Sequence, residues 1–146
     1  MLKRYTFWLT AAVIFQFLTA IVHALSLFIS PEPANDTERQ LLVLLGTYKL
    51  NAGAGFAPTF SNLFTALSSC FSLLCLLGGL TNGWLLIRHA EPTLMKGILG
   101  INVGIFGICF VLMAYFTFLP PIIFTFLIFI NLLAAFIVVP KVESII

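Results

Sequence analysis

Long stretches of apolar residues alternate with shorter polar segments along this chain. Stretches without charged residues and of about the length that crosses a bilayer lie at 5–29, 58–80, 97–119 and 122–139. A helix needs roughly 20 apolar residues to cross the hydrocarbon core. The pattern therefore predicts an all-α integral membrane protein, a four-helix bundle that forms one domain over residues 1–146.

The segment 30–57, between the first two predicted spans, contains a shorter helical pattern. Pro31, Glu32 and Pro33 are expected to end the first helix, and Thr37 with Gln40 has the spacing of a capping box. Apolar residues then recur at helical spacing, at Leu41, Leu44, Leu45 and Tyr48. We expect a short helix over about 38–49 that lies in the membrane interface. The sequence NAGAGFAP at 51–58 would then turn the chain back into the membrane.

Small residues are regularly spaced on the second and third predicted spans. The second span carries Ser61, Thr65, Ser68, Ser72, Cys75, Gly79 and Asn82, and the third carries Gly97, Gly100, Gly104 and Gly107. Helices in a bilayer associate through close backbone approach, which small residues permit. We therefore expect these two faces to pack together as a hairpin. A homodimer face, or a groove for a flat ligand or lipid, remains an alternative for the glycines.

The two remaining connections are short. Residues 81–93 are expected to join the second and third spans, with Trp84 at the membrane interface. Pro120 and Pro121 are expected to break the chain before the fourth span, in which Asn131 is the only strongly polar residue at depth. The third and fourth spans would then be antiparallel neighbours.

Composition and charge agree with a membrane protein and suggest its orientation. Of 146 residues, 61% are hydrophobic and 8% charged, and the net charge of +2 is too small to indicate nucleic-acid binding. Basic residues on one predicted side are Lys3, Arg4, Arg88, Lys96 and Lys141, whereas Arg39 and Lys49 share the other side with Glu32, Asp36 and Glu38. The positive-inside rule then predicts cytoplasmic termini and an external 30–57 connection.

The first span contains polar residues on one face, at Gln16, Thr19, His23 and Ser26. Ionisable residues inside a membrane are candidates for function. His23 is expected at the level of Ser61 and Thr65, so Gln16, Thr19, His23, Ser61 and Thr65 define a candidate ligand pocket. A neutral His23 that is hydrogen-bonded to the two hydroxyls, and so joins the spans, is the structural alternative. A proton-relay or metal role, and haem ligation by His23 of two copies, are further alternatives.

Several classes of function are disfavoured by what the spans contain. No Asp or Glu lies inside them, which argues against ion-coupled transport. The chain has no CxxC pair, phosphate-binding loop, nucleophile elbow or metal-ligand spacing. We therefore expect neither an enzyme nor a bound cofactor.

The block GTYKLNAGAGFAPTFSNLF at 46–64, with FSLLCLLGGLTN at 71–82 and the histidine of the first span, resembles a family of small, uncharacterised four-span bacterial inner-membrane proteins. An arginine is often expected in that family just before the second span, where this chain has Pro58 and Thr59. The resemblance implies the four-span topology and a bacterial inner membrane, and it implies no activity.

These observations favour a non-enzymatic accessory, scaffold or binding protein of the bilayer, with a second copy or a larger membrane complex as its partner. The alternative is a transporter or binding protein for a small or lipophilic ligand that uses the His23 pocket. A quinone or haem redox protein is the third interpretation.

Overall fold

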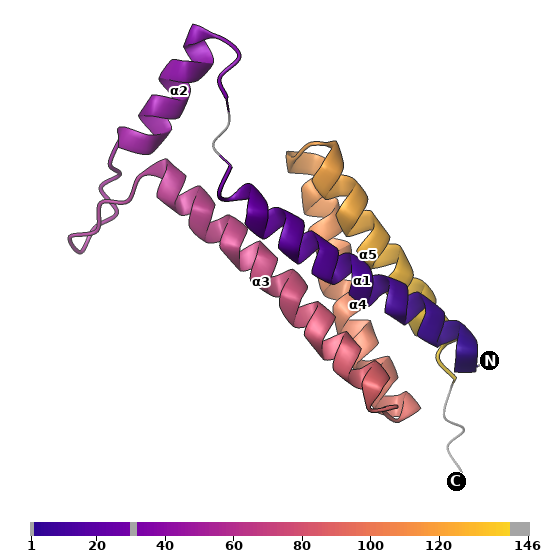
Figure 1. Cartoon of the computed structure of the whole chain (residues 1–146). Coiled ribbons are helices and arrows are strands. Elements are labelled where there is room, and N and C mark those ends of the chain that lie inside the picture. The colour runs from indigo at the N-terminus through magenta and orange to yellow at the C-terminus, as the bar shows by residue number, and fades with distance from the viewer. Residues whose placement is uncertain (1, 30–31, 141–146) are drawn as a thin grey trace. The chain divides into compact units, whose positions relative to one another are not determined.

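The computed structural model describes residues 2–29 and 32–140, with side chains from Tyr5 onward. Within these ranges the chain forms five helices: α1 (Leu2–Ser26), α2 (Asp36–Thr47), α3 (Phe60–Ile87), α4 (Pro92–Phe116) and α5 (Leu119–Val138) (Figure 1). All but α2 are long and apolar enough to cross a membrane. The predicted all-α class is confirmed, and the four long helices have the length and composition of membrane spans. Pro31 and Lys141, used above for a helix end and for the charge pattern, lie outside the described residues.

The connection between α3 and α4 is shorter than expected, because α3 continues to Ile87 and leaves only residues 88–91 outside the helices. Thr81 does not interrupt α3, since its hydroxyl donates to the Leu77 carbonyl at 2.7 Å. The helix ends in a Schellman motif. The His89 N–H donates to the Leu86 carbonyl, and the Ala90 N–H donates to the Leu85 carbonyl. His89 takes the left-handed conformation of this motif, with φ +47°.

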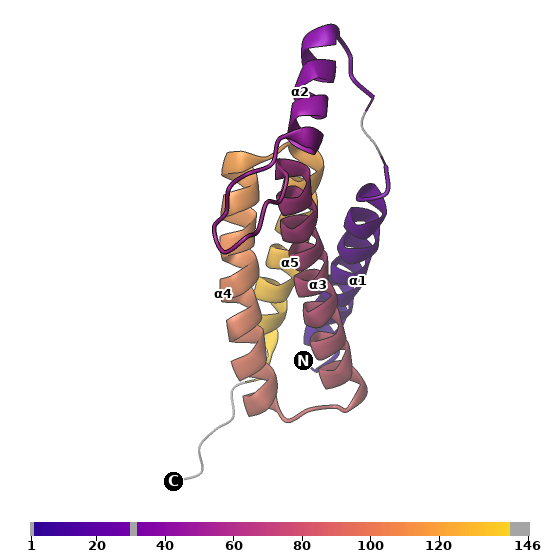
Figure 2. The same ribbon diagram turned by 90° about the vertical axis from the view of Figure 1, so that its left-hand side faces the viewer.

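The two prolines before the last span begin α5 instead of breaking the chain. Pro120 and Pro121 lie in the first turn of α5, where a helix leaves its N–H groups without internal partners. The chain turns at Thr117 and Phe118, directly after α4. So short a connection makes α4 and α5 antiparallel neighbours, as expected, and they lie side by side in Figures 1 and 2.

α2 starts two residues before the expected position because Asn35 is its N-cap. The Glu38 N–H donates to Asn35 Oδ1 at 2.9 Å, and Glu38 Oε2 accepts from the Ala34 N–H at 2.6 Å. The expected capping box of Thr37 and Gln40 is thus wrong, because Asn35 and Glu38 cap the helix. α2 buries none of its residues. After α2, the Leu50 N–H donates to the Pro58 carbonyl, which closes the 51–58 turn.

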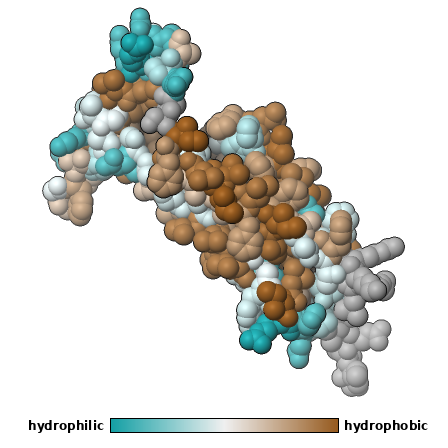
Figure 3. All heavy atoms as spheres, viewed as in Figure 1, coloured by the Kyte–Doolittle hydropathy of each residue, from teal (hydrophilic) through white to brown (hydrophobic). Residues whose placement is uncertain are grey.

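The chain forms two compact units. The first contains Met1–Thr19 and Cys75–Ile146, and the second contains Ala20–Leu74. The first unit combines most of α1, the second half of α3, and α4 and α5. Its core is formed by fully buried residues from all four helices: Leu9, Ala12, Gln16, Cys75, Asn82, Leu85, Leu99, Phe106, Thr125, Ile128, Leu132 and Ala135. Hydrophobic side chains also cover the outer faces of the long helices, as lipid contact requires (Figure 3).

Candidate functional site

A pair of carboxamides lies at the centre of the first unit. Gln16 of α1 and Asn82 of α3 are both 0% exposed, and Asn82 Nδ2 donates to Gln16 Oε1 at 3.1 Å. Among the described residues, Gln16 Nε2 and Asn82 Oδ1 have no hydrogen-bond partner. Buried polar groups are normally paired, since an unpaired one costs about 1–3 kcal/mol. The pair therefore joins α1 to α3 while one donor and one acceptor stay unsatisfied.

Glycine at position 78 makes room for this pair. A Cβ added at Gly78 would lie 2.5 Å from Gln16 Nε2 and 3.0 Å from Cε2 of Phe106, the buried aromatic residue of α4. No side chain fits at that distance without displacing a neighbour. Gly78 therefore lets α1 and α4 both approach the backbone of α3, which is the close packing that small residues permit in membranes.

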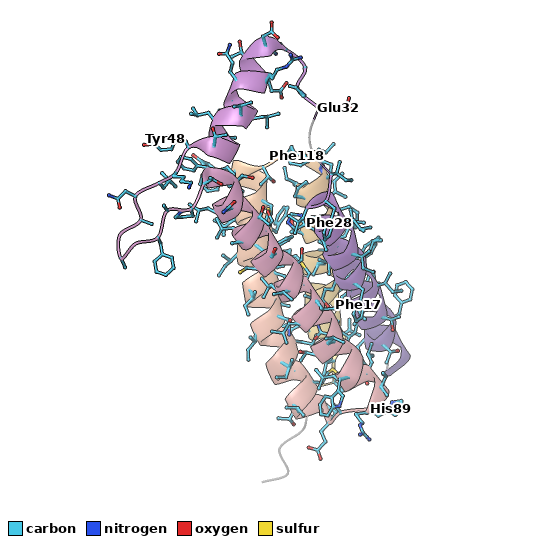
Figure 4. All side chains as sticks on the ribbon, turned by 60° about the vertical axis from the view of Figure 1, so that its left-hand side comes forward. Phe17, Phe28, Glu32, Tyr48, His89 and Phe118 are labelled. Carbon is cyan, nitrogen blue, oxygen red and sulfur yellow. The ribbon has the colours of Figure 1, made fainter. Side chains whose placement is uncertain are left out.

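A surface groove of about 850 Å³ runs between α1 and α3 in the first unit. We call it the α1–α3 groove, and it is lined by Val13, Phe17, Gly79, Leu80, Thr81, Gly83, Trp84, Leu86 and Ile87. Gly79, Gly83 and Leu86 recur at helical spacing and form its floor, and Leu80, Trp84 and Ile87 form a parallel exposed rim. Val13 and Phe17 supply the opposite wall from α1, and Phe17 is labelled on this helix in Figure 4.

The α1 wall is held in place by the two glycines of α3. A Cβ added at Gly79 would lie 3.3 Å from the Phe17 ring, and one added at Gly83 would lie 3.7 Å from Val13 Cγ1. At the first distance the Phe17 ring would have to move by a few tenths of an ångström, and the second is an ordinary van der Waals contact. Gly79 and Gly83 thus form a small-xxx-small motif that packs against α1 and leaves the groove beside it.

The groove ends at a polar turn. Ile87 is its last lining residue, and the exposed Arg88 and His89 follow it directly. Hydrophilic atoms gather at this end of α3 in Figure 3, and His89 is labelled there in Figure 4. In the described part of the chain Arg88 makes no ion pair, although Glu91 lies in the same turn. A cationic side chain without a described ion-pair partner therefore follows the apolar groove.

The glycines of α4 have different neighbours from those expected. Gly100 and Gly107 face rings of α5, since an added Cβ would lie 3.3 Å from Phe136 and 3.1 Å from Phe129. Gly97 and Gly104 are exposed, and no described atom lies within 4 Å of an added Cβ. The expected pairing of this face with the small residues of α3 is therefore wrong at these positions. Rings of α5 fill the space beside Gly100 and Gly107.

The same Phe136 ring has a second neighbour on α4. Lys96 Nζ lies 5.5 Å from the Phe136 ring centroid, within the range of a cation–π contact. Gly100 is one helical turn further along α4, so the ring lies against a glycine and a lysine of the same face.

The small residues of α3 divide into two groups by burial. Ser72, Cys75, Gly79 and Asn82 are buried, whereas Ser61 and Thr65 are exposed and Ser68 is half-buried. In the first unit, Gly79 and Asn82 contact Phe17 and Gln16 of α1. This face of α3 thus packs against α1, and of the α4 glycines Gly100 and Gly107 contact α5.

The residues of the candidate His23 pocket are distributed over both units. Gln16 and Thr19 belong to the first unit, where the Thr19 hydroxyl donates to the Phe15 carbonyl at 2.6 Å. His23, Ser61 and Thr65 belong to the second. There the half-buried His23 packs edge-on against Phe71, with ring centroids 5.1 Å apart, and no hydrogen bond joins it to either hydroxyl. The expected bond from His23 to Ser61 or Thr65 is therefore not formed.

Sequence reasoning missed the pairing of Gln16 with Asn82 and the role of Gly78. The available signal was the run GGLTNG at 78–83, which places two glycines four residues apart next to a lone carboxamide. Within residues 2–29 and 32–140 no three His, Cys, Asp or Glu side chains cluster as metal ligands would. Comparison with protein-family models, curated proteins and solved structures gives no significant match to the chain.

Proposed function

We propose that this protein is a non-enzymatic binding module of the membrane, and that the α1–α3 groove is its working surface. The observation that carries the proposal is the groove itself. Its volume of about 850 Å³ lies within the roughly 300–1,000 Å³ of small-molecule sites, and nearly all its lining residues are apolar. The preferred ligand is accordingly a lipophilic molecule that reaches the groove from the bilayer.

The test is to fill the groove and compare retained molecules. Gly83→Leu adds a side chain at a lining position where a Cβ meets only Val13, at 3.7 Å. Gly104→Leu is the matched control, because it makes the same replacement on α4, where no described atom lies within 4 Å. Native mass spectrometry of gently extracted protein should find a lipophilic molecule on the wild type and on Gly104→Leu, and none on Gly83→Leu. Equal retention by both variants would refute the proposal.

A second function is favoured by the open glycines of α4. Gly97 and Gly104 alternate with the exposed Ile101 and Ile108 on one helical face. Glycine in a helix interior costs about 0.5–1 kcal/mol relative to alanine, and at these positions no described atom lies within 4 Å of an added Cβ to offset that cost. Such a face suits the close approach of a transmembrane helix from another subunit. The protein would then be an accessory or scaffold subunit.

The same pair of variants separates the two functions. If the protein is an accessory subunit, Gly104→Leu should abolish its complex with the partner in native membranes, and Gly83→Leu should preserve that complex. The complex is detected as a crosslink or as a stoichiometric mass. If the complex with the partner persists in Gly104→Leu, or if the wild type is monomeric in native membranes, this second function is refuted. The monomer result would leave the groove proposal unaffected.

We further propose a bacterial inner membrane as the location, with both termini cytoplasmic. The charge pattern supports the orientation, since Arg88 and Lys96 flank the connection between α3 and α4, whereas the acidic Asp36 and Glu38 begin α2. In a chain whose native cysteines are replaced, an impermeant maleimide should label Ala52→Cys in intact cells. His89→Cys should be labelled only after permeabilisation, and the opposite pattern would reverse the orientation.

A further inference from the structure

We propose that the α1–α3 groove holds an acyl chain of an anionic phospholipid whose headgroup pairs with Arg88. This inference rests on the proposed function and names the ligand class of the same groove. Two features carry it: the shape of the apolar floor and rim, and the exposed Arg88 side chain, which follows the last lining residue and has no described ion-pair partner.

The shape of the groove fits a linear chain. Its floor follows Gly79, Gly83 and Leu86, so it runs along the helix axis rather than across it. From Gly79 to Ile87 the rise is about 12 Å at 1.5 Å per residue. An elongated apolar ligand can therefore lie along the floor, between the α1 wall and the rim.

A transmembrane helix is the competing occupant, and the packing of the glycines argues against it. The advantage of glycine for a docking helix is an accessible backbone. At Gly79 and Gly83 that backbone is already approached by Phe17 and Val13 of α1. On the other side Trp84 projects from the rim, with 56% of its surface exposed. A helix of about 10–12 Å diameter would contact the rim before it reached the floor.

A basic residue at the end of the groove complements the negative charge of a phospholipid headgroup. Trp84 is of the residue type enriched at the level of lipid headgroups, and Arg88 lies one helical turn beyond it. Since Arg88 is exposed and has no described ion-pair partner, its guanidinium can form two parallel hydrogen bonds with a phosphate. Basic sites between transmembrane helices are known to recognise anionic headgroups. An acyl chain in the groove places a phosphate at this level.

The experiment counts bound lipids by native mass spectrometry. The full chain in detergent is titrated with phosphatidylglycerol and, separately, with phosphatidylcholine of identical acyl chains. Four proteins are compared: the wild type, Arg88→Gln, Gly83→Leu and the control Gly104→Leu. A basic residue at an anionic surface is worth about 1 kcal/mol, which corresponds to about a fivefold difference in affinity.

We expect the wild type and Gly104→Leu to bind one phosphatidylglycerol about fivefold more tightly than phosphatidylcholine. Arg88→Gln should bind both lipids equally, and Gly83→Leu should bind neither. Equal binding of the two lipids by the wild type would overturn the headgroup assignment, and the groove would remain a site for lipophilic molecules. Unchanged binding by Gly83→Leu would overturn this inference together with the groove function. A protein partner released only by Gly83→Leu would show that a helix occupies the groove.

Discussion

The packing at Gly78 leads to a quantitative prediction for Gly78→Ala. In a helix interior alanine is more favourable than glycine by about 1 kcal/mol. Here the added Cβ would lie 2.5 Å from Gln16 Nε2, so the Gln16 side chain must move. Nε2 is the end of a flexible side chain, but Gln16 is fully buried and the buried Phe106 ring lies 3.0 Å from the same Cβ, so overpacking should cost about 1–3 kcal/mol. Displacement of Gln16 also removes its bond to Asn82, and interhelical hydrogen bonds in membranes contribute about 0.6 and at most about 1.7 kcal/mol. The sum predicts a net destabilisation of about 1–3 kcal/mol.

The assay is reversible unfolding in mixed micelles by added dodecyl sulfate, followed by circular dichroism. Gly104→Ala is the control, because it has the same propensity gain and no described atom within 4 Å of the new Cβ. It should be as stable as the wild type or up to about 1 kcal/mol more stable. Gln16→Ala should also be less harmful in the Gly78→Ala background than alone, since it removes the clashing atom. If Gly78→Ala were as stable as Gly104→Ala, the reasoning about this contact would be refuted.

Three further predictions concern other contacts. Gln16→Leu should lower the free energy of unfolding by about 1–2 kcal/mol because it leaves the buried Asn82 amide unpaired, and adding Asn82→Leu should recover most of the loss in the same assay. If the effects of the two substitutions on the free energy of unfolding simply added, this prediction would be contradicted. His89→Gly should stabilise the protein by about 1 kcal/mol, because φ +47° strains any residue with a Cβ, and a lower midpoint of unfolding would contradict the Schellman assignment. Asn35→Ala should lower the stability of α2 by about 1 kcal/mol, because it removes the N-cap. Amide hydrogen exchange should become faster in the first turn of α2 and stay unchanged in α3. Unchanged exchange in α2 would exclude the cap.

The class and order of the helices could be predicted from the sequence because bilayer thickness fixes the length of an apolar span. The ends of the helices were harder to predict, because polar residues near them form hydrogen bonds that hydropathy does not encode. Thr81 bonds to its own helix and Asn82 to another, so α3 extends beyond the expected residue 80. Pro120 and Pro121 are compatible with a helix start as well as with a break.

The partner of each small residue could not be predicted from spacing alone. A stripe of glycines indicates close approach, but it does not say whether a neighbouring backbone or a large ring fills the space. Phe129 and Phe136 fill it on α4, and Phe17 does so on α3. The polar pair of Gln16 with Asn82 was missed for a related reason, because helical periodicity assigns residues to faces without stating which faces meet.

The contact of Phe136 with Gly100 and Lys96 also has a consequence for how deeply α4 and α5 sit in the bilayer. A lysine near a membrane boundary extends its ammonium toward water while its methylene groups remain among lipid tails. The Lys96 ammonium lies 5.5 Å from a ring of α5, so vertical sliding of either helix past the other would separate the charge from that ring. The ring thereby couples the immersion depth of the two helices. A thicker or thinner bilayer should tilt them together instead of shifting them separately.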